Sequence, residues 1–178
     1  LFNGFTNWDD PEFLFLNPLV KAVPFSNLWE IFTTPTSGCY YPLMTLSYQL
    51  EHAVFGFNPF PYHLHNLILH LINVILVFLI LRRLGAAEPA TAIAALLFAI
   101  HPLQVEAVAW LASRKDVLFA LFYLWAVLAY VKLPNGESPP GKQARNTGLA
   151  MILLLFVLSL LAKPMAVSFP AVLLLLDY

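Results

Sequence analysis

The sequence predicts an all-α, polytopic integral membrane protein, and three observations carry this prediction. Hydrophobic residues make up 60% of the 178 residues and charged residues 11%, less than half the share of about 25% that soluble domains carry. Mean hydropathy is +0.76. Several apolar runs approach the length of roughly 17–25 residues that crosses a bilayer. The net charge of −1 gives no bulk attraction to nucleic acid, so no nucleic-acid partner is expected.

Apolar runs separated by polar or proline-containing breaks divide the chain into its expected elements. The predicted membrane helices are 62–84, 89–101, 116–132, 147–163 and 164–178. The first has the clearest spanning length, whereas the second is short for a span. Pro164 suits the first turn of the last helix, where its missing N–H does no harm. The polar, Pro- and Gly-rich stretch 134–146 is predicted as a cytosolic connector.

Residues 1–61 are predicted to form a long extracytosolic loop, because the acidic residues gather there and at the other helix ends of that side. Within this loop, 41–57 has apolar residues at helical spacing and Thr45, Gln49 and His52 on the opposite face. This pattern predicts an amphipathic helix in the membrane interface, or a helix packed on other extracytosolic structure.

The chain, which opens without Met, is expected to be a fragment of one membrane module, truncated at both ends.

A polar stripe follows the first predicted span. His63, Asn66, His70 and Asn73 are spaced by three, four and three residues, which places them on one helix face. This face either lines a substrate cleft or hydrogen-bonds to neighbouring helices. His63 and His70 lie two turns apart, about 10 Å along the axis, which is too far for one zinc ion. We therefore predict no metal site.

Ionisable side chains also gather between the second and third apolar segments: His101, Glu106, Arg114, Lys115 and Asp116. Lys163 ends another apolar segment on the same predicted side of the membrane. These cations either snorkel to the surface as flanking charges or bind an anion there. An Arg fork suits a phosphate group in particular.

Two adjacent carboxylates, Asp9 and Asp10, precede Pro11 in the first loop. One carboxylate can accept a proton from an acceptor hydroxyl, while cations on the same side hold a phosphate leaving group. Asp10 has the better position to cap a helix that begins at Pro11, so Asp9 is the predicted base. These charges suit a glycosyltransferase with a lipid-phosphate sugar donor, or a transporter. The motifs GxGxxG and GxxxxGK[ST] do not occur, which disfavours a nucleotide donor.

Four stretches resemble a known family: "DDPEFL", "YYPLMTLSYQLEHAVFGFNPFPYHLHNLILH", "HPLQVEAVAW" with "RKD", and "KPMAV". They resemble the N-terminal membrane part of the transmembrane and tetratricopeptide-repeat-containing family, whose members are similar to GT-C glycosyltransferases of the protein O-mannosyltransferase type. The resemblance implies a GT-C-like helical bundle, with Asp9 or Asp10 as the catalytic base. It also implies cations near the donor phosphate, for which Arg114, Lys115 and Lys163 are the candidates.

The resemblance further implies a polyprenyl-phosphate sugar donor, often of mannose, and a Ser or Thr hydroxyl of a protein as acceptor. Membrane lipid is the expected surrounding, and no cofactor beyond the lipid-linked donor is expected. His101 and Glu106 match a His-Pro…Glu motif of the family, and His63 is a further candidate site residue. The form "RKD" differs from the "RAD"-like form of animal members, which predicts a bacterial cytoplasmic membrane, or the endoplasmic reticulum if the protein is eukaryotic.

Two other functions stay open on the sequence. The same charges fit a carrier or flippase for a lipid-linked anion, although no internal inverted repeat supports one. A non-catalytic membrane anchor for a downstream tetratricopeptide-repeat domain is the second alternative.

Overall fold

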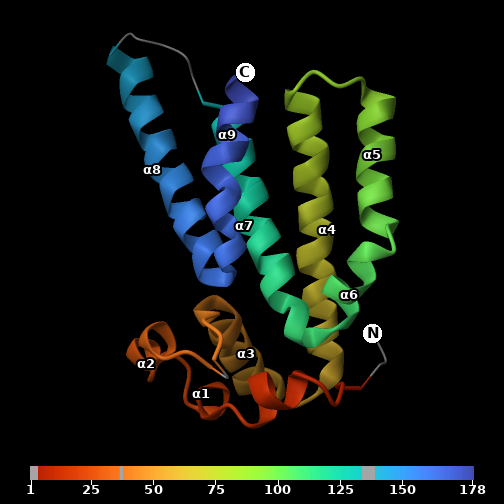
Figure 1. Cartoon of the computed structure of the whole chain (residues 1–178), viewed down its shortest axis with the longest axis vertical. Coiled ribbons are helices and arrows are strands. Elements are labelled where there is room, and N and C mark those ends of the chain that lie inside the picture. Colours follow the sequence, from red (N-terminus) through yellow and green to blue (C-terminus); the bar gives the residue numbers. More distant parts are fainter. Residues whose placement is uncertain (1–3, 37, 134–138) are drawn as a thin grey trace.

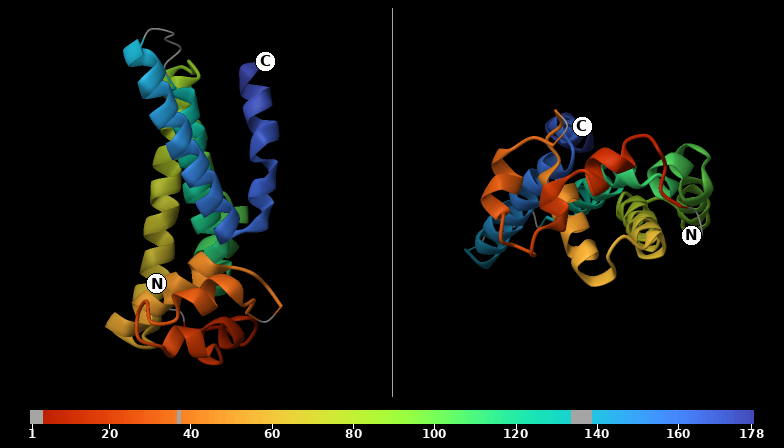
Figure 2. Two further views of the ribbon diagram at one scale, coloured as in Figure 1. Left: turned by 90° about the vertical axis from the view of Figure 1, so that its left-hand side faces the viewer. Right: turned by 90° about the horizontal axis from the view of Figure 1, so that it is seen from below.

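A computed structural model describes residues 4–36, 38–133 and 139–178, and every named element in these ranges is helical. Long helices stand side by side, and short helices of the N-terminal segment spread over one end of them (Figures 1 and 2). We call this N-terminal segment, residues 4–58, the cap. The prediction of an all-α, polytopic membrane protein is confirmed by this architecture and by its apolar helices.

The cap is built from a π-helical turn and three helices: η1 (Pro11–Phe15), α1 (Pro18–Lys21), α2 (Leu28–Thr33) and α3 (Pro42–Phe55). The helix expected within 41–57 is therefore present as α3. Gln49 on its polar face is buried, donating to the carbonyl of Leu19 (2.8 Å) and accepting from the N–H of Phe25 (3.1 Å). Leu50 and Val54 on its apolar face are exposed. The helix thus buries a mixed face with Met44, Tyr48 and Gln49, and it leaves Leu50 and Val54 outward, where a membrane interface can accept them.

The bundle begins with α4 (Pro59–Arg83), α5 (Glu88–Ile100), α6 (Leu103–Ala109) and α7 (Arg114–Val131). The helix α4 starts three residues before the predicted boundary because Asn58 caps it, accepting from the N–H of Phe60 at 3.2 Å. Among the described residues, α4 and the stretch 141–162 of α8 are long and apolar enough to cross a membrane. The pair α5 and α6, bent by 59°, counts as a third if it forms one broken span.

Two elements near the C-terminus differ from the predicted ones. The helix α8 (Pro139–Ala162) extends into the predicted connector 134–146, of which 134–138 lie outside the described residues. Lys, Gln, Ala and Arg in this polar stretch are good helix formers, so its polarity indicates solvent exposure and not a loop. The predicted helix 164–178 is divided into a 3₁₀ turn, η3 (Pro164–Ser168), and α9 (Phe169–Asp177), which begins anew with Pro170 in its first turn.

The helix α7 packs against both α4 and α8, and α4 also packs against α5. Two apolar clusters result, one between the cap and the bundle around Met44, Tyr48 and Tyr62, and one inside the bundle around Leu76 and Ala126. The starts of α4 and α7 and the end of α8 meet the cap at the same end of the bundle (Figure 1). Every charged residue predicted for the site belongs to the cap, to the segment from the end of α5 to the first turn of α7, or to the turn after α8.

Candidate functional site

The acidic pair divides into a buried and a partly exposed carboxylate. Asp10 is only 1% exposed and accepts hydrogen bonds from the N–H and hydroxyl of Thr6 (2.8 and 2.9 Å) and from the N–H of Ala112 (3.0 Å). Asp10 therefore ties the cap to the short 3₁₀ turn η2 (Leu111–Ser113) before α7. A helical turn does begin at Pro11, but the expected capping bond from Asp10 is absent because its oxygens are engaged elsewhere.

Asp9 is the partly exposed member of the pair, as the predicted base must be. Its charge acts on Tyr41, the residue that precedes α3. Burial raises the pKa of the Tyr41 hydroxyl, Cys39 adds to this, and the carboxylates of Asp116 and Asp9 raise that pKa further. Asp9 and Asp116 thus lie within electrostatic reach of one phenol, although they are distant in sequence. The catalytic role of Asp9 stays a prediction.

Lys115 lies in a cage of aromatic rings at the start of α7. Its Nζ donates to the carbonyl of Ala112 (2.8 Å) and lies 5.4, 5.6 and 5.7 Å from the ring centres of Tyr41, Trp110 and Phe13. The rings attract the ammonium group by cation–π interaction without neutralising it. Lys115 thus keeps a net positive charge next to the phenol that Asp9 also influences.

Lys163, in contrast, forms an ion pair with the carboxylate of Asp116. Their side chains are 21% and 30% exposed, so this pair is partly accessible to solvent. It joins the turn after α8 to the first turn of α7. We call Asp9, Tyr41, Lys115, Asp116 and Lys163 the charged cluster.

Arg114 is wholly internal. It is 1% exposed, and its guanidinium donates to Asn66 Oδ1 (2.8 Å), to the carbonyl of Tyr62 (2.7 Å) and to the carboxylate of Glu51, with which it forms an ion pair. The rings of Tyr48 and Tyr62 lie 4.7 and 5.7 Å from it. Each of the three guanidinium nitrogens therefore donates inside the protein, and the predicted contact of Arg114 with a donor phosphate stays a prediction.

The remaining predicted residues lie outside the charged cluster. His101 is exposed at the bend between α5 and α6, where its Nδ1 accepts from the N–H of Leu103 (3.2 Å), and Glu106 is exposed on α6. Within the described ranges, neither forms a hydrogen bond or ion pair with a member of the charged cluster. His63 is buried on α4, at 5% exposure. Their site roles stay predictions.

The polar stripe of α4 binds neighbouring backbone. Asn66 donates to the carbonyls of Val108 and Trp110 (3.4 and 3.5 Å), and Asn73 to that of Val117 (3.0 Å). His70 contacts the carbonyl of Ala99 (3.1 Å) through its Nε2. Of the two alternatives for the stripe, a substrate cleft or hydrogen bonding to neighbouring helices, the second therefore accounts for Asn66, His70 and Asn73.

Sequence reasoning missed Glu51, Tyr41 and the pairing of Asp116. Glu51 is 4% exposed on α3, and it contacts both Arg114 and His65. The sequence signal for Glu51 was a carboxylate on the inward face of an amphipathic helix. Such a carboxylate predicts a cationic partner, because buried acids are almost always paired. Among residues 4–36, 38–133 and 139–178, no group of three or more His, Cys, Asp or Glu side chains lies close enough to hold a metal ion.

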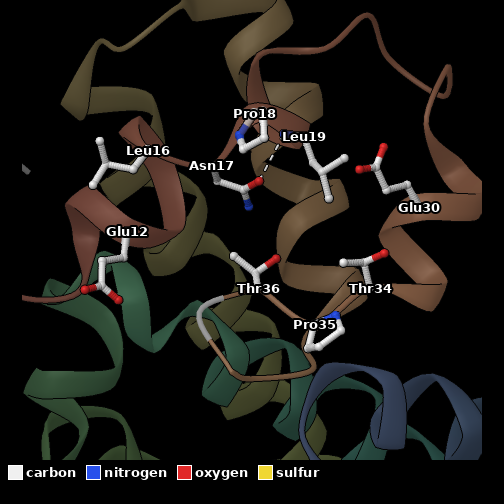
Figure 3. A pocket seen from close by; sticks show the side chains of 9 residues that line it. All are labelled: Glu12, Leu16, Asn17, Pro18, Leu19, Glu30, Thr34, Pro35 and Thr36. Atoms are coloured by element: carbon white, nitrogen blue, oxygen red, sulfur yellow. Dashed lines mark hydrogen bonds between the residues drawn. The ribbon is translucent and has the colours of Figure 1, made fainter.

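A pocket of about 550 Å³ opens in the cap. Glu12, one helical turn after Asp9, lies at one side of it, and Glu30 lies at the other (Figure 3). Asn17 between them is buried and accepts from the N–H of Leu19 (3.0 Å). The pocket adds a second polar surface to the end of the bundle that carries the charged cluster.

Comparison with known proteins decides the family. Residues 40–178 match the family model of dolichyl-phosphate-mannose-protein mannosyltransferases. This chain belongs to that family. The matched range holds Tyr41, all of the bundle and the three cations, whereas Asp9 and Asp10 precede it. No solved structure matches the chain.

Curated relatives agree with this assignment and with the resemblance to transmembrane and tetratricopeptide-repeat-containing proteins. The chain is 38% identical over 126 residues to Protein O-mannosyl-transferase TMTC2 of Mus musculus, covering 70% of the chain and 15% of that protein. It is 29% identical over 189 residues to Protein O-mannosyl-transferase TMTC4 of Homo sapiens, covering 94% of the chain and 26% of that protein. It is 36% identical over 134 residues to Protein O-mannosyl-transferase Tmtc1 of Drosophila melanogaster, covering 71% of the chain and 16% of that protein. The chain therefore spans a quarter or less of most of these relatives.

These relatives come from animals, so they give no support to the predicted bacterial cytoplasmic membrane. Membrane insertion itself rests on the apolar helices of this mannosyltransferase-family chain.

Proposed function

We propose that the protein carrying this chain transfers mannose from a polyprenyl-phosphate donor to a Ser or Thr hydroxyl of an acceptor protein. The observation that carries the proposal is the charged cluster where the bundle joins the cap. Lys115 lies 5.4 Å from the ring centre of Tyr41 and, in the described part of the chain, forms no ion pair with a carboxylate. Trp110, which also borders Lys115, packs against Trp8, the neighbour of the partly exposed Asp9. Membership of a mannosyltransferase family and the names of the relatives support the donor sugar and the protein acceptor.

In the proposed reaction, Asp9 accepts the proton of the acceptor hydroxyl while the hydroxyl oxygen attacks C1 of the sugar. The bond between C1 and the phosphate oxygen breaks, and polyprenyl phosphate leaves with the bonding electrons. Lys115 stabilises the charge that grows on the leaving phosphate. The pair of Lys163 with Asp116 positions the start of α7, because it holds that turn to the end of α8. The polyprenyl chain stays in the bilayer beside the apolar helices.

The pocket between Glu12 and Glu30 suits the acceptor in this scheme. It lies in the cap, which also carries Asp9, and it offers carboxylate and hydroxyl groups to a polar peptide. We propose that the cap faces the extracytosolic side, which is the lumen of the endoplasmic reticulum in a eukaryotic cell.

The test is sugar transfer by the intact protein from polyprenyl-phosphate mannose to a Ser- or Thr-containing peptide. Asp9→Asn keeps the size of the side chain and removes its basicity, so turnover should fall by about 10²–10⁴-fold. Lys115→Met keeps an unbranched chain inside the aromatic cage and removes the charge, so it should weaken donor use while the melting temperature holds. Wild-type turnover in both variants would refute the roles given to Asp9 and Lys115, whereas no transfer by the wild-type protein would favour a membrane part that only anchors it.

A further inference from the structure

A second pocket, of about 390 Å³, lies between α3, α4 and α7, and it shares no residue with the charged cluster. Its volume lies in the range of roughly 300–1,000 Å³ that is common for ligand sites. It is lined by Ser47, Leu50, Glu51, Val54, Phe55, His65, Leu69, Arg114 and Leu118.

The walls of this pocket are continuous with the lipid-facing surface. Leu50, Val54 and Phe55 belong to the outward face of α3 and are 39%, 72% and 46% exposed. Leu69, on the opposite wall, lies ten residues into α4, the longest candidate span, or about 15 Å from its start. The pocket therefore opens onto exposed apolar side chains where the cap meets α4.

The polar end of the pocket carries no unpaired cation. Glu51 bridges Arg114 and His65, so the guanidinium charge is balanced inside the protein. The imidazole of His65 is the accessible polar group, because its side chain is 48% exposed while those of Arg114 and Glu51 are 2% and 4% exposed. A headgroup without net charge suits this end, whereas an anionic headgroup finds no free positive charge to balance it.

We propose that this pocket binds one acyl chain of a zwitterionic phospholipid of the bilayer, with the polar headgroup at His65. The chain lies between Leu50 and Val54 on one side and Leu69 and Leu118 on the other. A bound lipid then holds α3, and with it the cap, against α4 and α7. This inference is independent of the proposed sugar transfer.

The test uses the intact protein in phosphatidylcholine nanodiscs that hold a trace of phosphatidylcholine with a photoreactive acyl chain. Crosslinks mapped by mass spectrometry should concentrate on α3 and on α4 near Leu69. Leu50→Trp should fill the pocket and reduce these crosslinks about tenfold, which corresponds to about 1.4 kcal/mol of binding free energy. Val54→Trp, at the more exposed rim, should act in the same direction and offers a second variant if Leu50→Trp lowers the melting temperature.

Leu79→Trp is the matched control, because Leu79 is 37% exposed on α4, against 39% for Leu50, and does not line this pocket. This control should crosslink like the wild type. Crosslinks spread evenly over the exposed apolar residues, or unchanged in both pocket variants, would overturn the proposal. Displacement by polyprenyl phosphate more strongly than by unlabelled phosphatidylcholine would overturn it too, since the pocket would then hold the donor. Sugar transfer measured on the same samples separates this result from the fate of the proposed function.

Discussion

Removal of the Arg114 charge should destabilise the protein strongly. Arg114→Met keeps an unbranched apolar chain but leaves the buried Glu51 carboxylate without its cation, and it takes the donors from Asn66 Oδ1 and the Tyr62 carbonyl. Loss of one partner from a buried ion pair typically costs about 3–5 kcal/mol. We expect a decrease of that size in the free energy of unfolding.

A double-mutant cycle with Glu51→Met isolates the pair. The double variant has neither buried charge, and His65, which also contacts Glu51, is half exposed and can be solvated instead. Arg114→Met and Glu51→Met together should therefore cost less than the sum of the single variants, with an interaction energy of about 2–3 kcal/mol. The assay is reversible unfolding of the intact protein in mixed micelles, with donor binding measured on the same variants.

Additive costs in the cycle, or a cost below about 1 kcal/mol for Arg114→Met, would refute the assignment of Arg114 to a structural ion pair. The competing prediction, that Arg114 holds the donor phosphate, gives a different signature. Donor affinity would then fall with little change in stability, and Glu51→Met would not restore it.

Four further outcomes are expected. Asp10→Asn should lower the free energy of unfolding by about 1–3 kcal/mol, because a buried acceptor of three bonds loses its charge, and thermal unfolding measures this. Asp116→Asn should cost less than about 1 kcal/mol by the same assay, since its pair with Lys163 is partly exposed. Burial raises the pKa of the Tyr48 hydroxyl above its ordinary value. The contribution of the neutral phenol to the free energy of unfolding is therefore complete below about pH 10 and is lost as the pH rises further. The loss of stability at alkaline pH should be less steep in Tyr48→Phe. Cysteine labels at Ser26 in the cap and at Ala86 between α4 and α5 should react from opposite sides of the membrane, in a Cys39→Ser background; reaction from one side would contradict the topology (Figure 1).

Helix positions could be predicted from the sequence because apolar length and proline placement are local properties. The observed α4, α5 and α7 begin and end within three residues of their predicted boundaries. The start of α8 could not be predicted in this way, since a polar segment with good helix formers gives the same low hydropathy as a loop. The two labelling positions that would best test this connector and the cap, Asn135 and Ser37, lie outside the described residues.

The pairing of charges could not be predicted because it depends on contacts between distant segments. Arg114 and Glu51 are 63 residues apart, and Lys163 and Asp116 are 47 apart. In the sequence, Arg114 and Lys163 are both candidates for the donor phosphate, and Arg114 is the stronger one because of its planar fork. Only their surroundings distinguish an internal cation from a partly exposed one.

The two cations at the start of α7 differ in how their charges are balanced. The N-terminus of a helix carries a partial positive charge, so Arg114 and Lys115 in its first turn are placed unfavourably. Glu51 balances Arg114, whereas Asp116, the only acid of that turn, is shared with Lys163. The positive charge that remains is therefore centred on Lys115, beside Tyr41 and the influence of Asp9. A helix start with one uncompensated cation attracts an anion, and this is the physical basis for proposing that the donor phosphate binds there.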